Sequence, residues 1–497
     1  MKLKPSITLA LILLIFLYLP VKIYPQTAFP RLEPDPKALD YYRLGLRDSY
    51  TWTELAQISL WASGDSSLSN LEKISSIAAA INDSSELPVS NREKAEFILT
   101  YMHRNVLRRY SLYQTRVDTL LSNGSFNCVS SSALYIILCR SMGINTSAVI
   151  TKDHAFVMVH IDGQDIDVET TNRFGFDPGN RKEFHDQFGR LTGFSYVPAQ
   201  NYRDRQLIKN IELISLILNN RIGELERRNN FSGAVPLAVD RAALLLGSSF
   251  VITAEVYSSE FLFSDPRKEL MDRLLNYGAT LLRTNKEEDG IRWALFASSL
   301  YPEPNRWNDY LDSAVNNRIA RFIKDRKITE AADFLENHKT YITQVNYAQL
   351  DSIVIDASLL NRANNIKTAA EGDVLISDIN KTHTAGRLTE KRTGELLTYS
   401  IQKIAEFLCA PPGRNWRAAA VYLENALSQY GANREIEQAL RRYRSNIASD
   451  FHNRFAAEWN KKNYEEAELI LNEGLAEFPD NRQLLNNRAI VNRHKNQ

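Results

Sequence analysis

Apolar residues recur at intervals of three and four along most of this chain, the spacing that collects them on one face of an α-helix. Helices are therefore predicted around residues 40–62, 67–82 and 91–102, and almost without interruption from residue 206 to the C-terminus. Between them the pattern changes to the alternation of apolar and polar residues that is typical of half-buried strands. Strands are predicted at residues 148–151, 155–161 and 165–170. The expected fold class is a small α+β domain followed by an all-α region.

The changes of pattern also give the expected domain organisation. The boundaries are 1–28 for a signal peptide or membrane anchor, 29–90 for an N-terminal helical segment, 91–205 for the α+β domain, and 206–345 and 346–497 for two helical parts. A chain of 497 residues is too long for one ordinary core and long enough for several such domains.

The N-terminus carries a targeting signal. Lys2 and Lys4 precede an apolar run from Ile7 to Leu19, which is shorter than the roughly 20 residues of a membrane-spanning helix. This run predicts export to the periplasm, the cell envelope or the extracellular medium. Because residues 26–28 lack the small-x-small pattern of a cleavage site, an uncleaved N-terminal membrane anchor is the alternative.

A recurring spacing marks the helical region. Near the C-terminus the chain has, at fixed intervals, an aromatic residue, a small residue, a large apolar residue, a second small residue and a proline. These are Tyr464, Ala467, Leu471, Gly474 and Pro479. Weaker copies are centred on Ala419, Ala331, Ala234 and Ala294. Small residues let neighbouring helices approach, and large residues fill the groove between them. The pattern resembles a degenerate tetratricopeptide solenoid, which implies a protein or peptide partner; generic helical hairpins are the alternative.

Composition and charge exclude several function classes. Sixty basic residues almost balance 59 acidic ones, so there is no clustered basic excess of the kind that binds nucleic acid. The hydrophobic fraction of 44% is that of a soluble globular protein. The sequence has no metal-ligand spacing, phosphate loop or dinucleotide fingerprint, so no cofactor and no metal are expected.

Three cysteines leave at least one thiol unpaired, and Cys128 is the one placed for chemistry. Cys128 and Cys139 would lie about 16 Å apart on one helix, whereas a disulfide requires Cα atoms within about 7 Å. Asn127 is a favoured N-cap residue and Gly143 a favoured helix end, so Cys128 falls in the first helical turn. Free N–H groups and the helix dipole favour a thiolate there. Cys139 lies in an apolar run and is expected to be a core residue.

A predicted β-hairpin supplies partners for this thiol. Asp162-Gly163 is a strong two-residue turn that would pair Ile161 with Gln164. In this register one face of the hairpin is apolar. The other face carries His154, His160, Asp165, Asp167 and Glu169.

The register also selects the carboxylate that orients His154. Glu169 is a diagonal neighbour of His154, about 7–8 Å away between backbones. Asp167 is about 13 Å away along the strand, and Asp165 is farther still. His160 shares the face but lies at the turn end, where a surface histidine is expected. Glu169 is therefore the predicted partner.

These segments resemble a known family. Residues 127–144 are similar to the nucleophile helix of the transglutaminase-like superfamily, and residues 154–171 are similar to its histidine and acid hairpin. The resemblance covers residues 91–205. It implies a papain-like, transglutaminase-like core, as in a bacterial subset in which this module precedes tetratricopeptide helices. Phe156 replaces the usual Trp of the family.

The resemblance also implies the roles of the residues. Cys128 would be the nucleophile, His154 the general base, and Glu169 the carboxylate that orients the imidazole, in the position where the family usually has Asp. The tetrahedral oxyanion would be held by the Cys128 backbone N–H and a second donor, for which Asn127 is the candidate.

The expected function is cleavage or transfer of amide (peptide) bonds through a thioester, by a cysteine peptidase, amidase or acyltransferase. The alternative is a catalytically inactive transglutaminase-like fold that serves as a tetratricopeptide protein-interaction scaffold in the cell envelope.

Overall fold

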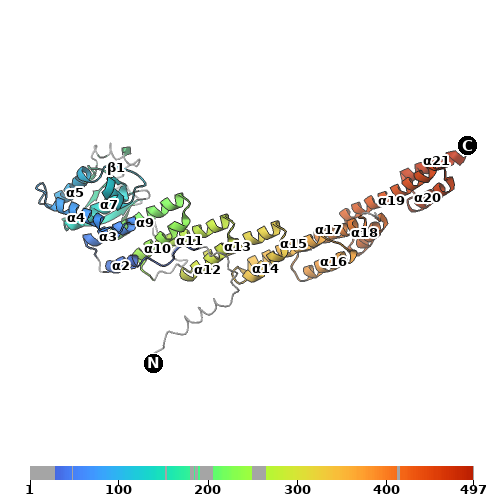
Figure 1. Ribbon diagram of the computed structural model, residues 1–497, viewed down its shortest axis with the longest axis horizontal. Coiled ribbons are helices and arrows are strands. Elements are labelled where there is room, and N and C mark those ends of the chain that lie inside the picture. Colours follow the sequence, from blue (N-terminus) through green and yellow to red (C-terminus); the bar gives the residue numbers. More distant parts are fainter. Residues whose placement is uncertain are drawn as a thin grey trace, which may run out of the picture. The chain divides into compact units, whose positions relative to one another are not determined.

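The computed structural model describes residues 28–46, 49–151, 154–179, 184, 189–190, 205–248, 265–410 and 415–495 (Figure 1). The predicted signal peptide or anchor lies outside the described residues. The chain divides into two compact units, Met1–Ala314 and Val315–Gln497, and each is described by itself. Within the described ranges, no helix combines the length and the apolar content that a membrane span requires.

The first unit places helices before and after a small sheet. The preceding helices are α2 (Pro36–Gly45), α3 (Trp52–Ser63), α4 (Leu68–Asn82), α5 (Asn91–Asn105), α6 (Val117–Asn123) and α7 (Cys128–Ser141). The strands are β1 (Arg109–Tyr110), β2 (Ser125–Phe126), β3 (Asn145–Ile150), β4 (Ala155–Ile161), β5 (Gln164–Val168) and β6 (Gln206–Ile208). The following helices are α9 (Asn210–Arg227), α10 (Phe231–Leu246), α11 (Pro266–Arg283) and α12 (Glu287–Leu300).

The main sheet has the strand order β5-β4-β3-β6, and every neighbouring pair is antiparallel. The predicted hairpin register is confirmed, because Ile161 pairs with Gln164. The turn residues Asp162 and Gly163 have φ angles of 51° and 78°, the left-handed values that this two-residue turn needs. Strand β6 and the parallel pair β1–β2 were not predicted, because strands of two or three residues are too short to show an alternating pattern.

Helix α7 is the centre of the first unit's core. It contacts α3, α5, α6 and α9 on the helical side and β3 and β4 of the sheet (Figure 1). Every side chain from Cys128 to Cys139 is buried. A helix that is buried on all sides has little freedom to shift, so its first residue is held firmly relative to the sheet.

Several predicted elements have different bounds in the structure: the strand predicted at 148–151 begins earlier, at Asn145, and the helix predicted at 91–102 continues to Asn105. Two further differences have a clear cause. The predicted helix 40–62 is two helices, because a capping box starts α3: Glu54 N–H donates to Thr51 Oγ1 (3.2 Å) and Thr51 N–H donates to Glu54 Oε2 (2.8 Å). The predicted strand 165–170 ends at Val168, because the next N–H, that of Glu169, donates to the carbonyl of Gly175 (2.8 Å).

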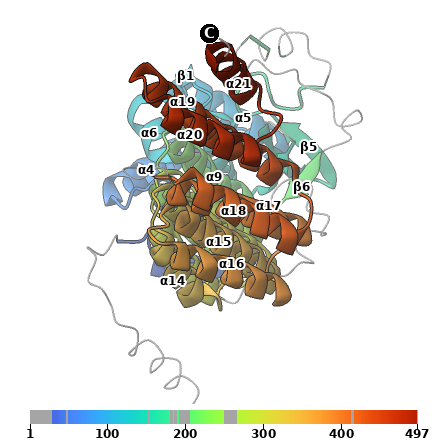
Figure 2. The same cartoon turned by 90° about the vertical axis from the view of Figure 1, so that its right-hand side faces the viewer.

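The second unit is helical in its described residues. Its helices are α14 (Ile328–His338), α15 (Gln344–Asn364), α16 (Ala369–Thr384), α17 (Glu390–Leu408), α18 (Trp416–Tyr430), α19 (Arg434–Asn460), α20 (Tyr464–Glu477) and α21 (Arg482–Lys495); α13 (Pro304–Lys324) contains the boundary between the units. Each helix from α14 to α21 contacts the next (Figures 1 and 2).

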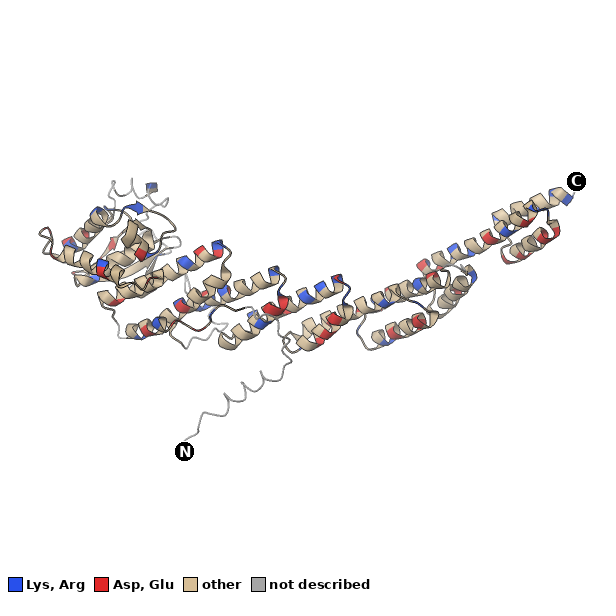
Figure 3. Cartoon of the chain, viewed as in Figure 1, with Lys and Arg blue, Asp and Glu red and all other residues tan. Residues whose placement is uncertain are grey.

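The small residues of the recurring spacing are buried where these helices meet. Ala331, Ala419 and Ala467 are fully buried. A Cβ added to Gly474 of α20 would lie 3.0 Å from the side chain of Phe451 on α19, so this glycine allows the two helices to approach closely. Basic and acidic residues are intermingled along the outer surfaces of the described helices (Figure 3).

Candidate active site

Cys128 is the first residue of α7, and Asn127 caps the helix. The Asn127 side-chain oxygen accepts hydrogen bonds from the N–H groups of Val129 and Ser130, both 3.0 Å long. In return the Asn127 N–H donates to the Ser130 hydroxyl (3.0 Å), which completes a capping box. Cys128 is 9% exposed. The thiol therefore lies at the positive end of a well-defined helix, where the dipole favours an anion.

His154 and Glu169 meet at the open end of the β4–β5 hairpin. His154 immediately precedes β4, and Glu169 immediately follows β5. The His154 Nε2 atom is 2.5 Å from Glu169 Oε2, and the two side chains are 6% and 0% exposed. The Cys128 thiol lies close enough to His154 to raise the pKa of the imidazole. The structure therefore brings the three predicted site residues together, with the imidazole between the thiol and the carboxylate.

The environment of His154 favours its charged form. Burial alone lowers the pKa of a histidine, because the imidazolium loses its hydration. The negative charges of Glu169 and of the Cys128 thiolate, together with the hydrogen bonds to both side chains, outweigh burial and raise the pKa of His154 well above 6.5. A histidine that favours its charged form beside a cysteine is the arrangement that stabilises a thiolate in cysteine-dependent enzymes.

Glu169 is held by the loop that follows it. Its Oε1 atom accepts hydrogen bonds from the Thr171 N–H (3.1 Å) and the Thr171 hydroxyl (2.7 Å), which leaves Oε2 to His154. The chain then folds back so tightly that a Cβ at Gly175 would lie 2.0 Å from the Glu169 carbonyl oxygen. The orientation of the carboxylate therefore depends on a loop that the sequence analysis did not identify.

Thr170 joins this loop to the helix that carries the thiol. Its hydroxyl is 2.8 Å from the Ser131 hydroxyl and 2.9 Å from the Ser132 hydroxyl, both on α7. The Thr170 carbonyl lies 3.1 Å from His103 Nε2 on α5. Burial, the first cause, lowers the pKa of His103 to about 4, so this histidine is neutral and can serve only as a hydrogen-bonding group. These contacts fix the distance between Cys128 and Glu169.

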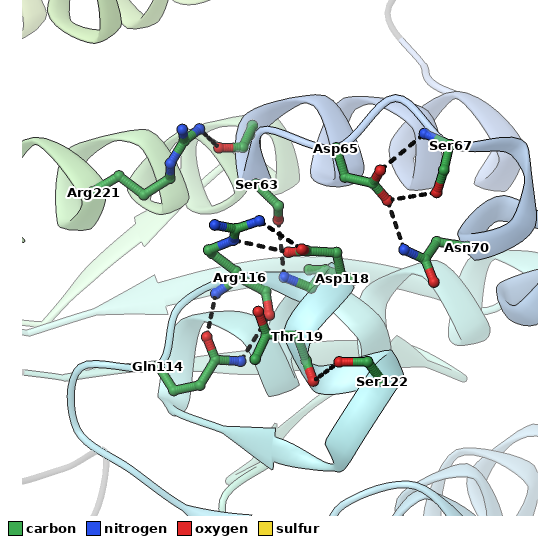
Figure 4. A network of polar contacts seen from close by, with 12 residues as sticks. Ser63, Asp65, Ser67, Asn70, Gln114, Arg116, Asp118, Thr119, Ser122 and Arg221 are labelled. Carbon is green, nitrogen blue, oxygen red and sulfur yellow. Dashed lines mark hydrogen bonds and ion pairs between the residues drawn. The ribbon is translucent and has the colours of Figure 1, made fainter. Parts of the chain in front are cut away.

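The segment between β1 and α6 contacts the start of α7, because the Ser130 hydroxyl donates to the carbonyl of Gln114 (3.1 Å). A network of polar contacts holds this segment (Figure 4). Gln114 donates to the carbonyl of Arg116 (2.8 Å), and Arg116 forms an ion pair with Asp118 (2.6 Å). The Val117 N–H donates to Ser63 Oγ of α3 (2.9 Å), which attaches the segment to the helical core.

The Asn127 side chain is engaged mainly at the start of the helix. Its oxygen caps α7, and one of its two amide hydrogens goes to the carbonyl of Leu112 (3.2 Å). The second amide hydrogen has no bond to a described residue, so the oxyanion role of Asn127 stays a prediction. A group that the sequence did not indicate lies nearby: the hydroxyl of Tyr110 on β1 is buried and has no hydrogen-bond partner among the described residues.

The remaining polar residues of the hairpin have other partners. Asp167 forms an ion pair with Arg205, whose guanidinium also lies 5.1 Å from the ring centre of Phe156. Asp165 lies 2.7 Å from His160, which is one-third exposed. Neither carboxylate is part of the Cys128 site, in agreement with the choice of Glu169 from the register.

A serine, a histidine and an aspartate also form a line of hydrogen-bonded side chains across the sheet. Ser147 Oγ is 2.8 Å from His160 Nε2, and His160 Nδ1 is 2.7 Å from Asp165 Oδ1. Ser147 lies within the ladder between β3 and β4, where neighbouring backbone N–H groups are engaged in strand pairing. Such a flat strand offers no donors for an oxyanion. This chain of hydrogen bonds therefore ties three strands together.

The other cysteines differ from Cys128. Cys139 is fully buried, and burial raises the pKa of its thiol to about 12. None of the three cysteines is part of a disulfide bond. In the part of the chain that the structure describes, no group of three or more His, Cys, Asp or Glu side chains could hold a metal ion.

Comparison with known proteins gives no family for this chain. No protein-family model matches the sequence, and no curated protein matches it significantly.

Proposed function

We propose that this protein is a cysteine-dependent enzyme that cleaves or transfers amide bonds through a thioester on Cys128. The observation that carries the proposal is the arrangement of Cys128, His154 and Glu169, in which one buried imidazole contacts both a helix-terminal thiol and a carboxylate. A purely structural cysteine would not need a charged partner, and burying charged groups costs stability unless they are well paired.

The surrounding architecture supports the same proposal. The thiol lies at the start of a buried helix, and that helix packs on an antiparallel sheet whose hairpin carries the histidine and the carboxylate. This order of elements resembles a papain-like, transglutaminase-like core. The resemblance extends from the fold to the site, because Glu169 lies at the position where the transglutaminase-like family usually has the Asp that orients the histidine.

The proposed reaction follows from these positions. The Cys128 thiolate attacks the carbonyl carbon of an amide, a C–S bond forms, and the π electrons move to the carbonyl oxygen. When the tetrahedral intermediate collapses, the C–N bond breaks and His154 gives its proton to the leaving amine. His154 then accepts a proton from water or from an amine, which attacks the thioester and regenerates the thiolate. Water gives hydrolysis, and an amine gives transfer.

Glu169 acts on His154 and not on the substrate. Its Oε2 atom fixes the ring so that Nδ1 is the nitrogen left for the thiol, and its charge stabilises the imidazolium. The fully buried carboxylate is shielded from water, which strengthens this interaction.

The helical repeats are proposed to bind the protein or peptide that carries the scissile bond. Support comes from a groove of about 780 Å³ between α16 and α18, whose walls combine polar and aromatic side chains, including Asn380, Lys381 and Tyr422. Arrays of helical hairpins commonly present such grooves to extended partners.

A direct test is acylation of Cys128 by an activated ester, p-nitrophenyl acetate, followed by mass spectrometry of the modified peptide. We expect a burst of p-nitrophenolate and an acetyl group on Cys128. Cys128→Ala should abolish the burst, and Cys139→Ala is the matched control that should retain it. Absence of any acyl adduct on the wild-type protein would favour an inactive interaction scaffold.

A further inference from the structure

The hydroxyl of Tyr110 is a buried polar group that the fold itself does not use. Its oxygen is inaccessible to solvent and has no hydrogen-bond partner among the described residues. Folded proteins almost always pair buried polar atoms, so each exception needs an explanation. An unpaired hydroxyl buried beside a reaction site is explained when its partner is a group that appears only during the reaction, once substrate binding has opened the site.

The pairing of β1 with β2 places Tyr110 beside the nucleophile. Tyr110 pairs in parallel register with Phe126, which precedes Cys128 by two residues, and the next N–H, that of Ser111, donates to the Phe126 carbonyl (2.8 Å). The Tyr110 ring packs edge-on against the Phe126 ring, with 5.9 Å between centroids. This contact fixes the ring and therefore the direction of its hydroxyl.

The pKa of Tyr110 is consistent with a position near Cys128 and Glu169. Burial is the first cause that raises the pKa of Tyr110, and the negative charges of Cys128 and Glu169 are the next two. The phenol therefore remains a neutral O–H donor throughout the physiological range. A phenol that is close to the thiol can donate a hydrogen bond to a charge that forms on a substrate bound to that thiol.

The Cys128 backbone N–H is a further donor at the start of the helix. The Asn127 side chain caps the N–H groups of the next two residues, Val129 and Ser130, and no described residue accepts from the N–H of Cys128. An oxyanion next to a helix N-terminus thus finds one backbone donor already in place. A second donor would complete the oxyanion site.

We propose that Tyr110 is a catalytic residue, whose hydroxyl donates a hydrogen bond to the oxyanion of the tetrahedral intermediate on Cys128. This assignment rests on the function proposed above. In the free enzyme the hydroxyl lacks an acceptor. When the carbonyl carbon becomes tetrahedral, the oxygen takes on negative charge between the Tyr110 O–H and the Cys128 N–H, and no proton is transferred to it.

The Tyr110→Phe variant distinguishes a hydrogen bond to the oxyanion from an influence on the reactivity of the Cys128 thiol. Acylation by p-nitrophenyl acetate passes through an oxyanion, whereas alkylation by iodoacetamide displaces iodide and forms none. We expect the variant to lose about 10²–10³-fold in acylation rate and to keep the alkylation rate of Cys128. Tyr113→Phe, at an exposed tyrosine three residues away, is the matched control and should keep both rates.

Thermal unfolding gives a second readout that does not depend on activity. Because the hydroxyl has no partner, Tyr110→Phe should leave the unfolding midpoint unchanged or slightly higher. A marked fall would show that the hydroxyl has a structural partner and would overturn the assignment. Equal losses of acylation and alkylation, or no loss of either, would also overturn it. A wild-type protein that is inert to the ester would instead reject the proposed function, and the role of Tyr110 with it.

Discussion

Glu169 Oε2 lies 2.5 Å from His154 Nε2, while Oε1 of the same carboxylate accepts both hydrogen bonds that Thr171 can donate. The two oxygens therefore have separate roles, since one holds the carboxylate in place and the other orients the imidazole. Neither role can be moved to the other oxygen without loss. The site should therefore be sensitive to a substitution of Glu169 that keeps the shape of the side chain but removes one of its two acceptor oxygens.

Glu169→Gln tests that division. A glutamine has the same shape but only one oxygen, so either Thr171 or His154 loses its acceptor, and the imidazolium loses its counter-charge. We expect the rate of ester acylation to fall by about 10²–10⁴-fold. The matched control is Asp165→Asn, at a carboxylate on the same strand that is 64% exposed and lies away from Cys128. Equal rates for Glu169→Gln and wild type would refute a role for the carboxylate.

The raised pKa of His154 predicts the direction of a pH effect on stability. The imidazolium is favoured in the folded state, so its stabilising contribution is complete below the unfolded pKa, about 6.5, and is lost as the pH rises through the folded pKa. The difference in free energy of unfolding between wild type and His154→Gln should therefore be largest near pH 6 and shrink at alkaline pH. Urea unfolding across this pH range measures it.

A control on the same strand keeps this experiment specific. His160→Gln changes a histidine that is one-third exposed and contacts neither Cys128 nor Glu169. Its stability difference from wild type should vary much less with pH. A His154→Gln difference that grows with pH would mean that burial, and not the two negative charges, dominates the environment of His154.

The cysteines should differ in their rate of alkylation. Iodoacetamide reacts with the thiolate, and a thiol with a pKa of about 12, such as Cys139, is thiolate at neutral pH only to the order of 10⁻⁴ or less. Cys128 has an imidazolium partner and, at 9% exposed against 0% for Cys139, is the less buried of the two, so we expect it to be labelled far sooner than Cys139. Mass spectrometry of a labelling time course resolves the three sites. Preferential labelling of Cys139 would contradict the assigned environments.

The sequence was sufficient for those parts of the site that depend on short-range chemistry. The turn Asp162-Gly163 set the hairpin register, because this residue pair readily adopts the two left-handed φ angles of a type I′ turn. Asn127 and Gly143 marked the two ends of α7 by their capping preferences. Once the register and the helix start were known, the choice of Glu169 over Asp167 followed from distances along a strand.

Contacts between segments far apart in the chain could not be predicted in this way. Thr170 bonds to Ser131 and Ser132, which lie almost 40 positions earlier, and no local pattern reports such a pair. Tyr110 reaches the site through a two-residue strand, too short to give a period. The carbonyl of Leu112, 15 residues away, accepts one amide hydrogen of Asn127, a contact that the capping preference alone does not indicate.

Gly175→Ala tests whether the loop after β5 controls the site from a distance. A Cβ at Gly175 would lie 2.0 Å from the carbonyl oxygen of Glu169, and this oxygen belongs to the backbone and cannot rotate away. The loop must therefore shift, and the shift must move the Glu169 carboxylate relative to His154. We expect ester acylation to fall by about 10²-fold, since a misplacement of about 1 Å is enough for such a loss, and the unfolding midpoint to fall as well.

Gly223→Ala is the control for a glycine in the same unit. Gly223 lies within α9, and the nearest atom to an added Cβ is the guanidinium end of Arg227 at 3.6 Å, an ordinary contact. Alanine is a better helix former than glycine, so this variant should gain about 0.5–1 kcal/mol in stability and keep its acylation rate. If Gly175→Ala behaved like Gly223→Ala, the loop would be free to relax, and the position of Glu169 would have to depend on Thr171 and Thr170 alone.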